Sequence, residues 1–200
     1  MSTVVIVHGW GGDSEGGWEP WLADELKQKG VSVLTPDMPN TSSPKIEEWV
    51  SFLDGLAKDV NRDLFFVGHS MGCQAILRYL ETLPEGSKIG GTVFVAPWLN
   101  LTDENWDETY TREIAEPWIK TPINWQKISA RTESFVVIYS DNDPYVPADS
   151  AQLIGEKLNA KIVLDSGRGH FSEEDDVTQL PAARDELLII MGLPVETPLI

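Results

Sequence analysis

Cysteine and histidine are both scarce in this chain, which has one cysteine and three histidines among 200 residues. The single cysteine, Cys73, excludes an intrachain disulfide and is typical of proteins from reducing compartments. Three scattered histidines without a cysteine cluster give no metal-ligand spacing. We therefore expect no metal and no other cofactor.

Basic residues are also few. Lys and Arg number 15 against 32 Asp and Glu, which gives a formal net charge of -17 and a pI near 4.4. An acidic surface repels nucleic-acid phosphates and anionic lipid headgroups, so we exclude DNA, RNA and membranes as partners. The charge serves solubility or, as the alternative, keeps anionic substrates away.

Long hydrophobic runs are absent. None approaches the roughly 20 residues of a membrane-spanning helix, and no basic and apolar leader precedes the strand-like residues Thr3–Val7. These absences predict a cytoplasmic location. A hydrophobic content of 42% and a charged content of 24% are ordinary for a globular protein, and the length predicts one domain over residues 1–200.

Short apolar runs alternate with amphipathic stretches along the chain. The runs predict strands buried on both faces, at Val4–Val7, Val31–Thr35, Leu64–Gly68, Thr92–Ala96, Phe135–Ser140 and Lys161–Asp165. Helical periodicity predicts helices between them, and the second should start after Ser43 and Pro44, as N-cap and first-turn proline. This order predicts an α/β fold, with a mostly parallel sheet of about six strands between two layers of helices.

Residues 97–130 interrupt the alternation. They hold Trp98, Trp106, Trp118 and Trp125 with three prolines, which is too long for a simple crossover and too aromatic for a free loop. One interpretation is an excursion that packs on the core. The other is a small cap of one or two short helices over the carboxyl edge of the sheet, with Trp98 in the wall of a substrate pocket.

The pentapeptide Gly68-His69-Ser70-Met71-Gly72 directly follows an apolar run. A G-x-S-x-G sequence between a strand and a helix is a nucleophile elbow, in which the serine lies on a strained turn. Neighbouring backbone comes so close that a Cβ at either glycine would clash. Ser70 is therefore the candidate nucleophile, and nearby Cys73 is interpreted as a small buried hydrophobe.

A serine nucleophile needs a base within hydrogen-bond reach, and the base needs an orienting acid. His170 follows the last predicted strand, which brings it to the same sheet edge as the elbow. His69 is a poor candidate because neighbours on a tight turn point in divergent directions. His8, after the first strand, is interpreted as a brace for its loop, so His170 is the candidate general base.

The orienting acid is expected in the loop after the preceding strand, where Asp141 and Asp143 compete. Asp143 precedes a Pro-Tyr-Val-Pro turn and is our choice. Asp141 is the alternative, and is otherwise a turn residue that bonds its own backbone. Asp165 is interpreted as a surface or turn residue.

An oxyanion hole needs two backbone N–H groups. Met71, the residue after the nucleophile, supplies one at a helix N-terminus. Trp10 supplies the other from the glycine-rich residues 8–12. The alternative for these glycines is a turn without such a role.

These motifs, with Pro36-Asp37-Met38-Pro39, resemble the α/β-hydrolases, and within them the small serine hydrolases of the retinoblastoma-binding protein 9 and YdeN group. The resemblance extends over about residues 4–190. It implies a compact hydrolase core, a triad of Ser70, Asp143 and His170, and hydrolysis of an ester, thioester or amide. The chain lacks the L-x-C-x-E segment that binds retinoblastoma protein, so no such partner is expected.

The sequence thus predicts an esterase-like serine hydrolase that acts on a small acyl substrate. Trp10, Trp98 and the other tryptophans of residues 97–130 favour an apolar pocket for neutral, short or medium acyl groups. The alternative is a protein-binding module on a hydrolase fold, because fold does not fix function. Ser70 argues against dehalogenase and epoxide chemistry, which would use an aspartate at the elbow.

Overall fold

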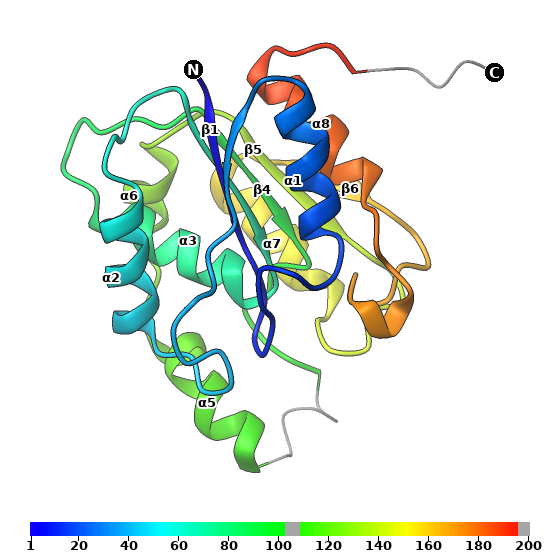
Figure 1. Cartoon of the computed structure of the whole chain (residues 1–200). Helices are drawn as coiled ribbons and strands as arrows, with labels where there is room; N and C mark the ends of the chain where they lie inside the picture. Colours follow the sequence, from blue (N-terminus) through cyan, green and yellow to red (C-terminus); the bar gives the residue numbers. More distant parts are fainter. Residues whose placement is uncertain (103–108, 196–200) are drawn as a thin grey trace.

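A computed structural model describes residues 1–102 and 109–195 of the chain (Figure 1). Its strands are β1 (Thr3–Val7), β2 (Ser32–Leu34), β3 (Leu64–His69), β4 (Gly91–Val95), β5 (Phe135–Tyr139) and β6 (Lys161–Leu164). Its helices are α1 (Glu19–Gln28), α2 (Ile46–Leu56), α3 (Met71–Thr82), α5 (Thr109–Lys120), α6 (Trp125–Ser129), α7 (Ala148–Leu158), the 3-10 helix η1 (Glu173–Asp175) and α8 (Pro181–Met191).

The six strands form one sheet in the order β2-β1-β3-β4-β5-β6, and every neighbouring pair is parallel. The predicted α/β fold is confirmed, with each strand boundary within one residue of its expected position. In a parallel sheet the carboxyl ends of all strands meet at one edge. The loops after β1, β3, β5 and β6 therefore come together there.

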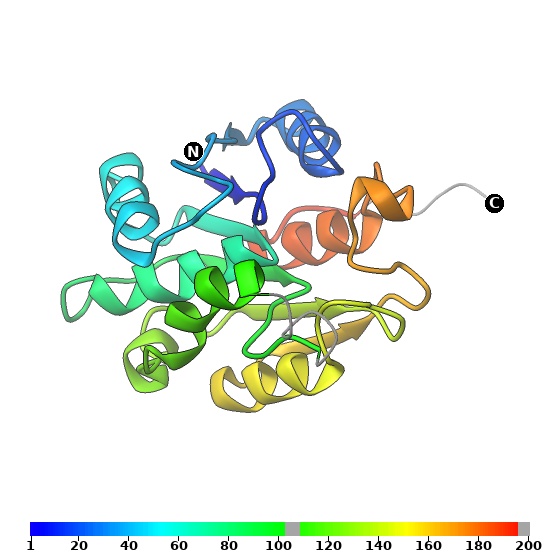
Figure 2. The same ribbon diagram turned by 90° about the horizontal axis from the view of Figure 1, so that it is seen from below.

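The sheet separates two hydrophobic cores, which gives three layers (Figure 2). Alternate strand residues such as Val5 and Phe66 join the core under α2, α3, α6 and α7. Their neighbours, such as Val4 and Phe65, join the core under α1 and α8. This alternation is the period-2 geometry of a strand that is covered on both faces.

Burial on both faces is wrong for the two edge strands. In β6, Ile162 and Leu164 are exposed, and the residues of β2 are only half-buried. Each edge strand has a neighbouring strand on one side only. Apolar runs indicate strands but do not distinguish an edge strand from a central one.

The predicted start of the second helix is also wrong. Its N-cap is Lys45, in an extended conformation, and the helix begins at Ile46. The carbonyl of Pro44 instead accepts a hydrogen bond from Nε1 of Trp118 at 3.1 Å. This hydrogen bond, from a residue 74 positions later in the sequence, thus holds Ser43 and Pro44 outside the helix.

The segment 97–130 contains two helices, α5 and α6, that lie in different places. Helix α5 lies beyond the carboxyl edge of the sheet (Figure 1), whereas α6 packs against α3. The Trp118 side chain is fully buried in the core, and Trp125 is partly buried against it. Trp106 lies outside the described residues.

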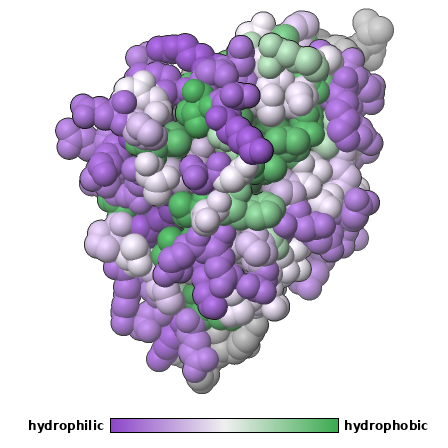
Figure 3. Space-filling model, turned by 60° about the vertical axis from the view of Figure 1, so that its left-hand side comes forward, coloured by the Kyte–Doolittle hydropathy of each residue, from purple (hydrophilic) through white to green (hydrophobic). Residues whose placement is uncertain are grey.

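Figure 3 shows hydrophilic residues over much of one face of the molecule, with hydrophobic residues gathered between them. Such a surface agrees with the net charge of -17. None of the helices in the described ranges combines the length and the apolar character needed to cross a bilayer.

Candidate active site

Ser70 lies on a sharp turn between β3 and α3 and has φ 49° and ψ -111°, an unusual backbone conformation for a residue other than glycine. The flanking glycines are required by close backbone. A Cβ at Gly72 would lie 2.1 Å from the Val7 carbonyl oxygen, and one at Gly68 would lie 2.8 Å from the Cys73 nitrogen. The predicted steric reason for both glycines is confirmed.

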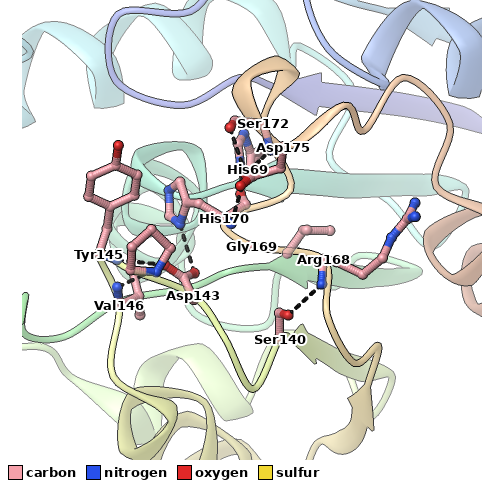
Figure 4. A network of polar contacts seen from close by, with 12 residues as sticks. His69, Ser140, Asp143, Tyr145, Val146, Arg168, Gly169, His170, Ser172 and Asp175 are labelled. Carbon is pink, nitrogen blue, oxygen red and sulfur yellow. Dashed lines mark hydrogen bonds and ion pairs between the residues drawn. The ribbon is translucent and has the colours of Figure 1, made fainter.

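His170 and Asp143 are brought together across two loops. Nδ1 of His170 donates to Oδ2 of Asp143 at 2.8 Å (Figure 4). The other oxygen of Asp143 accepts the backbone N–H groups of Tyr145 and Val146 at 2.8 and 3.0 Å. The carboxylate is thereby fixed in position, and its contact fixes the imidazole as the Nδ1–H tautomer if the ring is neutral.

The competing aspartate has a different place. Asp141 is exposed, and its oxygens accept bonds from Oγ of Ser166 at 2.6 Å and from the backbone of Gly167 at 2.9 Å. These hydrogen bonds lower the pKa of the Asp141 carboxyl. Asp141 therefore joins the loops after β5 and β6 without contacting the imidazole, and Asp165 lies just beyond the end of β6.

Two residues that the sequence did not single out also hold the His170 loop. Oγ of Ser140 accepts the backbone N–H of Arg168 at 2.9 Å (Figure 4). Oδ1 of Asn142 accepts the backbone N–H of Gly169 at 2.8 Å. Both acceptors follow β5 directly. The loop that carries Asp143 thus also positions the backbone that precedes His170.

The backbone of His170 itself is held from both sides. Its N–H donates to Oδ2 of Asp175 at 2.9 Å, and its carbonyl accepts from Nε2 of His69 at 2.8 Å. Gly169 and Phe171, on either side, have φ of 56° and 58°. Gly169 adopts this conformation freely, but Phe171 is strained in it unless contacts hold the segment. The bonds of Asp175 and His69 to the His170 backbone provide such contacts.

A cavity of about 610 Å³ opens at this edge of the sheet. This volume is within the size range of small-molecule sites. Ser70 and His170 both line the cavity. In the described residues no hydrogen bond joins Ser70 to His170. The expected apolar wall is present in Trp10 and Trp98, but four acidic residues also line the cavity: Asp13, Glu19, Glu173 and Glu174.

The loop after β1 contributes His8 and Trp10 to the cavity wall. His8 is buried, donates from Nδ1 to the Gly9 carbonyl at 2.8 Å, and accepts the Met38 N–H at Nε2, 3.0 Å away. Burial lowers its pKa, so the neutral ring braces the loop as expected. The indole of Trp10 donates to the Ser42 carbonyl at 3.1 Å.

Two groups near the elbow are buried. Met71, the first residue of α3, is fully buried at its side chain. Cys73 is also buried, donates to the carbonyls of Gly68 and Val95, and has its thiol pKa raised by burial. Because the thiolate is the reactive form, these contacts agree with a structural role for Cys73.

Glu19 is a further residue that sequence reasoning missed. It is the first residue of α1, only 5% exposed, and lies with Oε1 3.6 Å from Nδ1 of His69. Burial raises the pKa of Glu19 to about 8 and lowers that of His69 to about 3. An acidic residue at a helix start resembles an ordinary surface charge in sequence, so no signal marked it.

Comparison with known proteins places this geometry in a family. The sequence profile of the serine hydrolases matches residues 4–188. The chain belongs to the serine hydrolase family. This serine hydrolase is 29% identical over 184 residues to YdeN of Bacillus subtilis, named as a hydrolase, and covers 93% of that protein and 92% of itself. It is also 29% identical over 176 residues to serine hydrolase RBBP9 of Rattus norvegicus, covering 86% of this chain and 88% of the relative.

Solved structures agree with this assignment. The crystal structure of the YdeN gene product from B. subtilis has a TM-score of 0.87 at 28% identity, over 96% of this chain and all of the other. Est1E from Butyrivibrio proteoclasticus, solved with ferulic acid, has a TM-score of 0.71 at 18% identity, over 96% of this chain and 90% of Est1E. The second likeness concerns the fold alone. This serine hydrolase is thus a hydrolytic enzyme with an α/β-hydrolase fold.

Proposed function

We propose that this enzyme hydrolyses small carboxylic esters, thioesters or amides through an acyl-enzyme on Ser70. One observation carries the proposal. Ser70, on its strained turn, lines the same cavity as His170, whose Nδ1 lies 2.8 Å from the fixed Asp143 carboxylate. A nucleophile, a base and an orienting acid from three different loops are the parts that serine acyl transfer requires.

In the proposed reaction Ser70 Oγ attacks the carbonyl carbon while Nε2 of His170 takes its proton. The same nitrogen then gives the proton to the leaving group, and the acyl group stays on Ser70. Water repeats these steps and releases the acid. The absence of a hydrogen bond between Ser70 and His170 is compatible with this proton transfer, because such hydrogen bonds often form only when substrate is bound.

The developing oxyanion needs donors, and we assign this role to the backbone N–H groups of Trp10 and Met71. Met71 begins α3, so its N–H and the helix dipole both favour a negative charge beside Ser70. Trp10 lies in the glycine-rich loop that lines the same cavity, and a Cβ on the preceding Gly9 would come within 3.3 Å of the Ser70 side chain. Such donors contribute about 3 kcal/mol each in comparable enzymes.

The cavity favours uncharged acyl groups over anionic ones. Trp98 and Leu101 offer apolar contacts, whereas the carboxyls of Asp13, Glu173 and Glu174 repel a negative charge. Leu101 and Thr111 belong to the segment 97–130, which supports a cap role for that segment. We expect neutral esters of short or medium chain length to be the best substrates, and a cytoplasmic location remains a prediction from sequence.

The test is covalent labelling with a fluorophosphonate, alongside hydrolysis of p-nitrophenyl esters of increasing chain length. Wild type should be labelled, and the Ser70→Ala variant should lose the label and about 10⁴–10⁶-fold in kcat. Ser70→Ala removes one half-buried hydroxyl from the cavity wall, so its thermal unfolding should match that of wild type. A folded wild type that neither labels nor hydrolyses any ester would favour the alternative, a protein-binding module.

A further inference from the structure

The buried carboxyl of Glu19 has no part in the proposed reaction, although it lines the same cavity. Its Oε2 lies over the start of α1, where a Cβ on Gly17 would come within 2.6 Å of it. The charged groups that act on it are Asp13 and Glu173, both acidic. A carboxylate enclosed among carboxylates is costly, so the neutral acid is the favoured form.

The protonation of His69 follows from its contacts. Nε2 lies 2.8 Å from the His170 carbonyl oxygen, which can only accept, so Nε2 carries hydrogen. Burial lowers the pKa of His69 to about 3, so the ring is neutral and Nδ1 has a bare lone pair. That lone pair faces Oε1 of Glu19 at 3.6 Å. The contact is attractive when Glu19 carries the proton and repulsive when it does not.

We propose that Glu19 and His69 are positioning residues for the general base: protonated Glu19 lies against the bare Nδ1 of His69 at 3.6 Å, and His69 Nε2–H donates to the carbonyl of His170 at 2.8 Å. The inference rests on the proposed function of His170. Trp18 packs edge-on to the His69 ring at 5.9 Å between centroids and holds it in this orientation. The protonated acid thus fixes the tautomer of one histidine, and that histidine fixes the backbone of the other.

The arrangement predicts a loss of activity at alkaline pH. Burial and acidic neighbours raise the pKa of Glu19 to about 8, so above that pH it releases its proton to water. The ring of His69 then favours the Nδ1–H tautomer, reached by proton exchange with solvent, and its Nε2 lone pair faces the His170 carbonyl. The titratable groups that face this pair are Asp13, Glu173, His8, Asp143 and His170.

The test compares kcat and KM from pH 5 to 10 in wild type, Glu19→Leu and Glu19→Gln, with Glu15→Leu as a control at an exposed residue outside the cavity. Glu19→Leu should lower kcat about tenfold to a hundredfold with KM within twofold, because a small misplacement of a base costs that much. The Gln amide donates like a protonated carboxyl. Glu19→Gln should therefore recover most of the lost kcat and abolish the alkaline decline.

Three results would overturn the proposal. These are an unchanged kcat in Glu19→Leu, a Glu19→Gln variant as slow as Glu19→Leu, or an alkaline decline that persists in Glu19→Gln. NMR of ring-¹⁵N histidine tests the pair without any substrate, and should show His69 as the neutral Nε2–H tautomer at pH 7. A cationic or Nδ1–H ring at that pH also refutes it. Absence of labelling and hydrolysis in wild type would instead refute the proposed function of Ser70.

Discussion

Two imidazole–carboxyl pairs lie side by side in this molecule and differ in their contacts. The rings of His69 and His170 have centroids 5.2 Å apart, and both pairs are almost equally buried. In one pair the His170 and Asp143 atoms are 2.8 Å apart, whereas in the other those of His69 and Glu19 are 3.6 Å apart. Equal burial has therefore not produced equal pairs.

The difference comes from the surroundings of each carboxyl. Asp143 accepts directed backbone hydrogen bonds from Tyr145 and Val146, which hold its carboxyl group in position beside the imidazole. Glu19 also faces backbone N–H groups at the start of its helix, but desolvation with the nearby Asp13 and Glu173 outweighs them. The lesson is that burial sets the cost of a charge, and neighbouring donors and charges decide whether that cost is met.

The consequence is a division of work between the two imidazoles. Nε2 of His69 is occupied by the His170 carbonyl, so it cannot receive the Ser70 proton. His170 uses Nδ1 for Asp143, which leaves Nε2 for the cavity side. Three substitutions break or sharpen this comparison.

The largest effect is expected from the same acid-to-amide change in the two pairs. Asp143→Asn should lower kcat about 10⁴-fold, because an amide can stabilise the wrong tautomer of His170 and cannot stabilise its cation. Glu19→Gln should have a far smaller effect at neutral pH. Rates of ester hydrolysis and of fluorophosphonate labelling measure both.

Asp141→Asn is the matched control for this prediction, since Asp141 lies two residues away and bonds Ser166 and Gly167 instead. It should change kcat less than tenfold. If Asp141→Asn were the slower variant, Asp141 and not Asp143 would be the orienting acid. The His170–Asp143 pair would then not be the catalytic one of the two pairs.

An intermediate effect is expected from Gly169→Ala. The new Cβ would lie 1.9 Å from Oδ1 of Asp175, so this carboxylate must move away from the His170 N–H. We expect kcat to fall about tenfold to a hundredfold and the free energy of unfolding to fall by about 1–3 kcal/mol. Steady-state kinetics and urea unfolding measure the two losses.

Gly167→Ala provides the control in the same loop. Gly167 also has a positive φ, of 75°, but its Cβ would meet nothing within 4 Å. The Gly167→Ala variant should therefore lose stability through backbone strain but keep the wild-type kcat. Equal kcat values in the two variants would mean that Asp175 does not position His170.

The parts of the site that sequence predicted are those set by local geometry and topology. The glycines of the elbow follow from backbone contacts close to Ser70, and the parallel sheet brings the loops of Asp143 and His170 to its edge. Each residue could be placed by the strand that it follows. The six strands were found for the same reason, because apolar runs are a local signal.

The parts that sequence missed depend on packing between distant segments. Glu19 resembles a charge at a helix start, and its burial depends on contact with His69, 50 residues later. Asp175 lies in an acidic run that resembles a solvated surface, yet it holds His170. Trp118 similarly displaced the start of α2 through its bond to Pro44. Such contacts leave no periodic or local pattern to read.

The last effect concerns stability as a function of pH rather than catalysis, and it follows from the neutral pair. The pKa of Glu19 is raised from 4.5 to about 8, so its contribution to stability is complete below pH 4.5 and is lost as the pH rises through 8. That of His69 is lowered from 6.5 to about 3, so its contribution is present above pH 6.5 and is lost as the pH falls toward 3. Each slope is at most about 1.4 kcal/mol per pH unit.

Between pH 4.5 and 6.5 the two slopes oppose one another, and between 6.5 and 8 only that of Glu19 remains. Urea unfolding at a series of pH values should therefore show wild type losing stability relative to Glu19→Gln from pH 4.5 to 8. Groups common to both proteins cancel in this difference, and Glu15→Gln should run parallel to wild type. Parallel curves for Glu19→Gln as well would mean that Glu19 is ionised in the folded enzyme, and the two imidazole–carboxyl pairs would then be alike after all.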